Sequence, residues 1–250
     1  MSLWAEFLRH DDRLVQKWAH YFPVYERHFG RYVNRPLLFV EIGCGKGGSL
    51  QMWKRYLGPH ARIVGLDIEP ECAAFEEQQI AVRIGDQADP AFLARVVEEF
   101  GTPDVVLDDG GHLAVPTVAS FRFLYPRLDR NGIYAVEDLH TAYWPEYGGG
   151  LRREGTFIEL AKTLVDELNA DLSRGAVAPT GFTRSTLSMH FYDSQVIFER
   201  GQALPRRDMR IGGRSAAPMP GAAARLTASP AATPPARAPG GPPGAERFPG

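Results

Sequence analysis

Five short apolar segments, each ending in an acidic residue, restrict the fold of this chain more than any other feature. Continuous apolar runs of this length are typical of strands that are buried on both faces of a sheet. Segments with helical spacing lie between several of them, and Asp89 precedes one as an expected N-cap. Strands that alternate with helices predict parallel βαβ units and a doubly wound α/β sheet. The expected strands are 37–43, 62–67, 81–86, 104–109 and 133–138, and the expected helices are 49–56, 90–100 and 115–124.

The residues before the first strand carry apolar side chains at helical spacing, interrupted by Pro23. This pattern predicts one or two helices ahead of the sheet, in an N-terminal helical segment at 1–36. The apolar positions are Leu3, Phe7, Leu14, Trp18, Phe22 and Tyr25.

The composition fits a single folded domain. A chain of 250 residues with 44% apolar residues can bury a full core, which excludes a fibrous or wholly disordered protein. The formal net charge is -2, so no basic field favours nucleic acid as a partner. Cys44 and Cys72 could form at most one disulfide, and a reducing compartment fits them best. The sequence contains no apolar run long enough to span a bilayer, and its first residues lack the pattern of a signal peptide. A soluble cytoplasmic protein with no membrane partner is therefore expected.

Residues 214–250 differ from the rest of the chain, because they hold nine of the twenty prolines with Ala and Gly between them. Such a segment cannot bury enough apolar surface to offset the entropy of ordering it, so a disordered tail is expected. Four arginines against one glutamate give the tail a charge of +3, which leaves -5 on residues 1–213. Residues 1–213, which comprise the N-terminal segment and the domain at 37–213, are therefore acidic.

The acids of this domain gather where the expected strands end. Ligands of open parallel sheets bind beyond the carboxyl ends of the strands, so these acids should meet at one edge. Taken singly, each could cap a helix or form a turn, but together they predict a ligand site. They are Glu41, Asp67, Asp86, Asp108, Asp109, Glu137 and Asp138.

The segment Gly43–Gly48 has the G-x-G-x-x-G spacing between the first strand and the next helix, which suits a nucleotide cofactor. Both a nicotinamide dinucleotide and S-adenosylmethionine fit this loop. The carboxylate of Glu41 favours S-adenosylmethionine, because that cofactor carries an ammonium and a sulfonium. Asp67 is placed to accept the ribose hydroxyls of either cofactor. Asp86 and Gln87 are expected at the adenine, and Lys46 is expected to be solvated.

Three carboxylates at two neighbouring strand ends, Asp109, Glu137 and Asp138, form an oxygen-rich set that suits Mg²⁺ or another hard divalent cation. The alternative is that two of them cap the turns that follow. Zinc is less expected, although His112 leaves it open. His112 lies three residues after Asp109 in a glycine-containing loop, where it can serve as a base for a hydroxyl.

Several strings of residues resemble the class I S-adenosylmethionine-dependent methyltransferases. More narrowly, they resemble the macrocin- and mycinamicin-type and the rhamnosyl sugar O-methyltransferases, with the cephalosporin-hydroxylase-like proteins as neighbours. The likeness runs from about His20 to Arg200. The strings are 39–50, 84–89, 108–112, 137–144 and 190–196.

The resemblance implies a Rossmann-like, mostly parallel sheet that a C-terminal antiparallel pair completes, for which 187–192 and 195–199 have the right composition. It implies an S-adenosylmethionine- and Mg²⁺-dependent O-methyltransferase that acts on a hydroxyl of a sugar or glycosylated natural product, with His112 as the base. The implied metal ligands are Asp109, Glu137 and Asp138, and the implied cofactor contacts are Glu41, Gly43, Gly45, Ser49, Asp67, Asp86, Gln87 and Asp108.

Some features depart from the family or stay open. Gly111 and Ala142 stand where serines are expected, which bears on substrate contacts more than on the metal. The large N-terminal domain of some relatives is absent from this sequence, and whether the chain forms a homo-oligomer is open. The aromatic segment 143–150 is either a lid or wall of the acceptor site, or a loop that packs on the sheet edge. The other functions considered are a nicotinamide-dependent oxidoreductase and a non-catalytic cofactor-binding protein.

Overall fold

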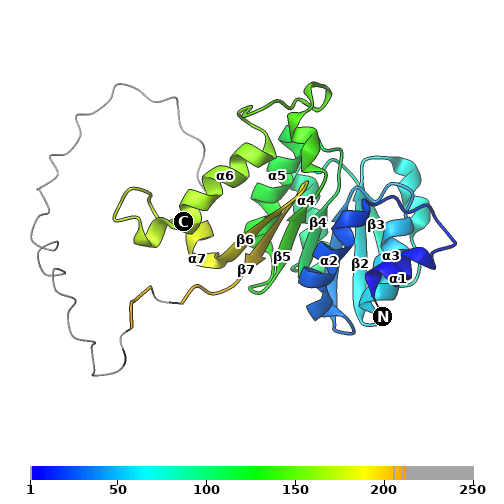
Figure 1. Ribbon diagram of the computed structural model, residues 1–250. Coiled ribbons are helices and arrows are strands. Elements are labelled where there is room, and N and C mark those ends of the chain that lie inside the picture. Colours follow the sequence, from blue (N-terminus) through cyan, green and yellow to red (C-terminus); the bar gives the residue numbers. More distant parts are fainter. Residues whose placement is uncertain (1, 205, 210, 212–250) are drawn as a thin grey trace, which may run out of the picture. The chain divides into compact units, whose positions relative to one another are not determined.

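Seven strands form one sheet in the order β3-β2-β1-β4-β5-β7-β6 in the computed structural model (Figure 1). The first five strands are parallel, β7 is antiparallel to β5, and β6 is antiparallel to β7, so the sheet ends in an antiparallel pair as the sequence predicts. The strands are β1 (Leu37–Ile42), β2 (Ala61–Asp67), β3 (Ile80–Ile84), β4 (Val105–Asp108), β5 (Ile133–Val136), β6 (Thr186–Tyr192) and β7 (Gln195–Arg200).

The structure describes residues 2–204, 206–209 and 211, and residues up to Leu204 form one compact unit. The expected tail at 214–250 lies outside the described residues. Within them, no helix is both long and apolar enough to cross a membrane.

Helices cover both faces of the sheet because alternate side chains of each buried strand point to opposite faces. Phe39 of β1 belongs to a core that includes α2 and α3, whereas Val40 belongs to a second core with α4, α5 and α6. Asp89 accepts a hydrogen bond from the N–H of Ala91 and caps α4, as predicted. The helices are α1 (Leu3–Leu8), α2 (Phe22–Phe29), α3 (Gly48–Leu57), α4 (Pro90–Phe100), α5 (Ala114–Leu124), α6 (Phe157–Leu168) and α7 (Gly181–Ser185).

The order of the strands reverses between β1 and β4. The chain adds β2 and β3 on one side of β1, and β4 and β5 on the other. Ligands of doubly wound sheets bind in the crevice that such a reversal opens at the carboxyl ends of the strands. The acids at the ends of β1, β4 and β5 therefore lie on both sides of the place where a cofactor is expected.

Two helices precede the sheet as expected, but the predicted helical spacing is wrong for the residues between them. Residues 9–18, here named the N-terminal strap, form no helix, and Leu14 and Trp18 are exposed on it. Pro23 lies in the first turn of α2 and begins that helix rather than breaking it, since a first-turn proline lacks only an N–H that has no helical partner.

The strap crosses the start of α3. Arg13 donates a hydrogen bond to the carbonyl of Phe75 at 2.9 Å, and Gln51 of α3 donates one to Asp12 at 3.0 Å. Gly48, the first residue of α3, has no side chain, and a Cβ there would overlap the backbone carbonyls of Arg13 and Leu14. The absence of a side chain at Gly48 therefore allows the strap to lie over the glycine loop.

Replacing Gly48 by alanine is expected to displace the strap without unfolding the domain, because alanine suits a helix while its Cβ overlaps the strap. Trypsin should then cut faster after Arg13 and Lys17, with a thermal midpoint close to that of the wild type. Gly111→Ala is the control, since a Cβ there meets nothing within 4 Å. Equal cleavage of the wild type and Gly48→Ala would contradict this account of the strap.

Candidate active site

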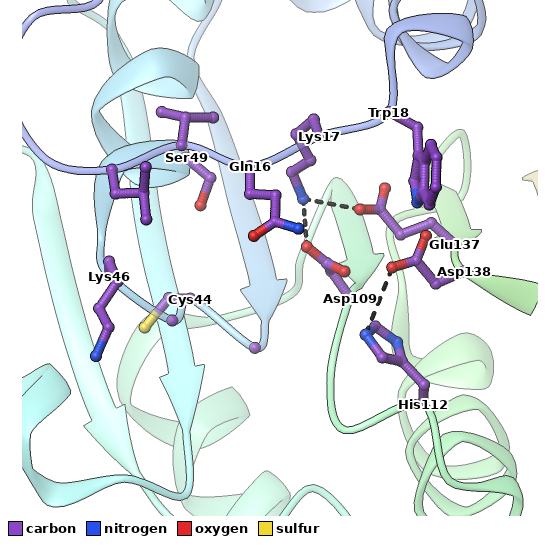
Figure 2. Close-up of a pocket in the computed structure, with 14 residues that line it drawn as sticks. Gln16, Lys17, Trp18, Cys44, Lys46, Ser49, Asp109, His112, Glu137 and Asp138 are labelled. Carbon is purple, nitrogen blue, oxygen red and sulfur yellow. Dashed lines mark hydrogen bonds and ion pairs between the residues drawn. The ribbon is translucent and has the colours of Figure 1, made fainter. Parts of the chain in front are cut away.

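A cavity of about 430 Å³ opens at the carboxyl ends of β1, β4 and β5 (Figure 2). The strap forms one wall, and the glycine loop and the acidic strand ends form the others. The lining residues are Leu14, Val15, Gln16, Lys17, Trp18, Gly43, Cys44, Gly45, Lys46, Ser49, Asp109, His112, Glu137 and Asp138.

The glycine loop brings the ends of β1 and β4 close together. Gly43 has φ +81°, and a Cβ there would overlap the carbonyl oxygen of Asp109. Only glycine tolerates both this backbone conformation and this contact. The loop therefore places the predicted cofactor site directly beside the predicted metal site.

A second cavity of about 190 Å³ lies on the other side of Gly43 and is lined by Asp67, Asp86 and Gln87. Asp67 ends β2, and its carboxylate accepts the N–H groups of Gly45 at 2.9 Å and Glu69 at 3.1 Å. These bonds hold the carboxylate at the edge of the loop. The residues expected at the ribose and adenine thus share one cavity, and their chemistry fits a nucleoside.

Glu41 and Ser49 lie between the cavity and the core. The Glu41 carboxylate is fully buried and accepts the Ser49 hydroxyl at 2.7 Å and the Trp53 indole N–H at 3.4 Å. Both oxygens of the Glu41 carboxylate, which is expected to face the positive charges of the cofactor, are therefore already hydrogen-bonded to the protein. Lys46 of the glycine loop is exposed, as predicted.

Asp108 ends β4, but its side chain points into a buried network rather than into either cavity. Its carboxylate accepts hydrogen bonds from Ser120 at 2.6 Å, Tyr134 at 3.0 Å and Gln87 at 3.2 Å. Burial raises its pKa to about 6, although these donors lower it. Asp108 reaches the expected cofactor region through Gln87.

Asp109, His112 and Asp138 come together at the open side of the main cavity. One potential ligand atom from each lies within 4.8 Å of the others, and His112 Nε2 is 3.5 Å from Asp138 Oδ2. His112 and Asp138 have φ values of +55° and +54°, a left-handed conformation that is uncommon outside glycine and often found at functional sites. Two carboxylates that reach a polar cavity fit a hard divalent cation.

Burial lowers the pKa of His112 below its ordinary value, while Asp138 and Glu137 act in the opposite direction. Burial thus favours the neutral imidazole over its charged form. Burial, followed by Glu137, raises the pKa of Asp109 well above its usual range, and Lys17 opposes this shift.

Glu137 is less open than the other two predicted metal ligands. Its side chain is 1% exposed, against 18% for Asp109 and 19% for Asp138. One Glu137 oxygen accepts the hydroxyl of Tyr25, and the other accepts the ammonium of Lys17 at 2.8 Å. The structure thus places Glu137 on the cavity wall, outside the cluster of Asp109, His112 and Asp138.

Lys17 was not predicted from the sequence. Its ammonium contacts Asp109 and, at 2.8 Å, Glu137 (Figure 2). It also contacts Glu41 at 3.2 Å. Burial alone would lower the pKa of Lys17, but the three carboxylates outweigh it and raise the pKa well above its usual range. Tyr21 was not predicted as a site residue either, and its hydroxyl donates a hydrogen bond to Asp138 at 2.6 Å. The surplus of acids at the strand ends was a signal that a compensating cation is needed.

No protein-family model matches the chain. It is 39% identical over 197 residues to the 8-demethyl-8-(2-methoxy-alpha-L-rhamnosyl)-tetracenomycin-C 3'-O-methyltransferase of Streptomyces olivaceus, covering 74% of this chain and 50% of the relative. It is 38% identical over 203 residues to the demethylmacrocin O-methyltransferase of Streptomyces fradiae, covering 75% of this chain and 51% of the relative.

A solved methyltransferase from the mycinamycin biosynthetic pathway, in complex with Mg, SAH and mycinamycin VI, superposes with a TM-score of 0.73. It is 33% identical, and the match covers 81% of this chain and 54% of that one. The chain is homologous to the macrocin- and mycinamicin-type sugar O-methyltransferases. It spans about half the length of the curated relatives that it matches.

Asp108→Asn is expected to change how the stability of this methyltransferase homologue depends on pH. The folded state keeps the proton of Asp108 up to about pH 6, whereas the unfolded chain loses it near 3.8. The wild type should therefore lose up to about 3 kcal/mol of unfolding free energy, relative to the variant, as the pH rises through this window. Urea denaturation between pH 4 and 7 measures the difference. Asp166→Asn, at an exposed helix position, is the control, and parallel curves for the wild type and Asp108→Asn would refute the prediction.

Proposed function

We propose that the protein is an S-adenosylmethionine- and Mg²⁺-dependent O-methyltransferase that acts on a hydroxyl of a sugar in a glycosylated small molecule. The observation that carries the proposal is the open cluster of Asp109, His112 and Asp138 in a cavity that also reaches the glycine loop. The curated relatives named above are O-methyltransferases, which favours S-adenosylmethionine over a nicotinamide cofactor.

The residues that would hold the cofactor lie on both sides of Gly43. Asp67, Asp86 and Gln87 would take the nucleoside in the smaller cavity, and the loop residues with Ser49 would take the amino acid end in the larger one. Asp109 and Asp138 would hold the divalent ion from the open side of the cavity, and Glu137, which lines the same cavity, would be the third ligand of the predicted set. The bound cofactor supplies the activated methyl group, and the ion supplies positive charge that favours an ionised hydroxyl.

His112 would accept the proton of the acceptor hydroxyl on its imidazole ring. Burial keeps this imidazole neutral, and Asp138 at 3.5 Å is placed to stabilise the imidazolium that forms. The left-handed backbone at both residues aims their side chains into the same cavity. The site must also hold the acceptor oxygen in line with the methyl carbon of the cofactor. This alignment depends on how rigidly the side chains of the site position the two reactants.

A chain of aromatic rings connects Trp18 with His112, two residues that line the cavity, and would form the acceptor wall. Trp18 meets His140 at 5.7 Å between ring centroids, and His140 meets Trp144 at 5.0 Å. Trp144 continues to Tyr147 at 5.9 Å, and Tyr147 lies 6.3 Å from His112. Exposed aromatic faces suit the apolar faces of sugar rings and planar aglycones. The predicted aromatic segment 143–150 thus supplies part of this wall, and the strap supplies Trp18.

Removing the predicted metal ligand or base is expected to stop methyl transfer. Asp109→Asn should abolish it, and His112→Ala should slow it on the order of 10²- to 10⁴-fold, since a positioned base contributes that much. The measurement is transfer of labelled methyl from S-adenosylmethionine to a panel of rhamnosides and catechol-like diols, with Mg²⁺ or with chelator. Lys162→Met, at the surface, is the control. Full activity of Asp109→Asn in chelator would exclude the metal-dependent reaction.

Trp18→Ala is expected to raise KM for a glycoside acceptor about five- to tenfold with little change in kcat, because an aromatic contact contributes on the order of 1 kcal/mol. Steady-state kinetics with the best acceptor of the panel measures it. Trp4→Ala removes an indole of similar exposure from α1, away from the cavity, and should leave KM unchanged. Equal KM values for Trp18→Ala and the wild type would remove Trp18 from the acceptor wall.

A further inference from the structure

Two histidines and a glutamate, here named the histidine cluster, meet where α2 packs against the last two strands. His28 comes from α2, His190 from β6 and Glu199 from β7. One potential ligand atom of each lies within 4.8 Å of the others, and His28 Nδ1 is 2.9 Å from a Glu199 oxygen. None of the three residues lines the active-site cavity or the smaller cavity beside Gly43. The histidine cluster is therefore separate from the site proposed for methyl transfer.

The register of the strands explains why these side chains meet. His190 of β6 pairs with Ile197 of β7, and Ile197 belongs to the core that includes α2. Alternate residues of a strand share a face, so Glu199 points to the same side as Ile197. The last turn of α2 carries His28, which is buried against this side of the sheet. Three elements that are distant in the sequence thus each contribute one side chain.

Hydroxyl groups hold both imidazole rings in place. The Tyr192 hydroxyl lies 2.9 Å from His28 Nε2, so the other ring nitrogen of His28 faces Glu199. The Ser188 hydroxyl lies 2.9 Å from His190 Nε2. In metal sites, a histidine that binds the ion through one nitrogen is almost always hydrogen-bonded through the other, which fixes its orientation. His28 already has this arrangement.

The donor types select a class of metal. Two imidazole nitrogens with one carboxylate oxygen suit Zn²⁺ and related transition metals, whereas Mg²⁺ prefers oxygen ligands alone. A metal binds only the neutral imidazole, and burial lowers the pKa of His28. The guanidinium of Arg31 lies 3.9 Å from Glu199, but its side chain is 43% exposed and also donates to the carbonyl of Asn131 at 2.9 Å. It can therefore turn away from the carboxylate when a cation binds there.

We propose that His28, His190 and Glu199 form a zinc site that fastens α2 to β6 and β7, with water as the fourth ligand. Tyr25 lies three residues before His28 on the same face of α2, and its hydroxyl donates to Glu137 of the active site. A metal in the histidine cluster would thus also steady the helix that contacts the acids. The inference goes beyond the proposed function and does not depend on it.

The test uses the full chain, which is freed of metal with EDTA and then titrated with ZnCl₂ and with CoCl₂. Calorimetry counts the zinc equivalents, and the visible spectrum of Co²⁺ reports the geometry and ligands of the site. One equivalent should be tetrahedral and lack a thiolate charge-transfer band, which separates it from the group of Cys44, Asp67 and Cys72. His190→Gln and Glu199→Gln should each lose this equivalent.

A variant outside the ligand set tests the geometry further. Tyr192→Phe removes the hydroxyl at His28 Nε2 and should weaken zinc binding at least about tenfold, because partners of metal-binding histidines contribute that much. An affinity equal to that of the wild type would contradict the proposed orientation of His28.

Two controls separate this site from other histidines. His60→Gln removes an exposed histidine and should keep the equivalent. His112→Gln removes a residue of the active-site cluster and should also keep it. Zinc should raise the thermal midpoint of the wild type and of His112→Gln, but not that of His190→Gln, because a ligand of the folded state alone stabilises it. Circular dichroism without zinc checks that each variant is folded, and if His190→Gln is not, Glu199→Gln takes its place.

The inference is overturned if His190→Gln and Glu199→Gln bind as many zinc equivalents as the wild type. It is also overturned if His112→Gln binds no zinc, since all binding would then belong to the active site. None of these measurements depends on methyl transfer, so a failure of the proposed function and a failure of this inference are distinguishable.

Discussion

Repulsion between carboxylates is the constraint on which the rest of this site depends. A parallel sheet brings the carboxyl ends of β1, β4 and β5 to one edge, and each of these ends carries an acid. Glu41, Asp109 and Glu137 approach closely enough to share one ammonium group, that of Lys17. Buried acids in such a cluster need cations to remain ionised, because burial and like charge both favour their neutral forms. One cation comes from the chain, and a divalent metal and a cationic cofactor would supply the others.

The strap is the second element that follows from this constraint. It has no regular structure of its own, so its course depends on what it binds. Gly48 gives it room over α3, Arg13 ties it to the segment after β2, and Lys17 ties it to the acids. Two neighbouring strap residues then differ in their surroundings, because Lys17 points inward to the acids and Trp18 is exposed beside the ring of His140.

Most secondary structure could be predicted because its causes are local. The seven strands and the helices α3, α4 and α5 lie within one or two residues of their expected bounds, since apolar runs, Asp89 and the glycine loop act over short distances. The conformation of the segment between α1 and α2 could not be predicted. The helical spacing of Leu14 and Trp18 is a local pattern, whereas the course of this segment depends on its contacts with α3 and the acids. Those contacts are between residues far apart in the sequence, and they override the weak local preference for a helix.

The sequence by itself determined the doubly wound sheet and the acids that gather at one of its edges, because strand periodicity and strand ends depend on consecutive residues. Only the tertiary structure decided how those acids divide. It closed Glu41 and Glu137 against Lys17, turned Asp108 into the network of Ser120 and Tyr134, and left Asp109 and Asp138 open beside His112. The reason is that the state of a carboxylate depends on which donors and charges surround it, and here those partners come from distant parts of the chain.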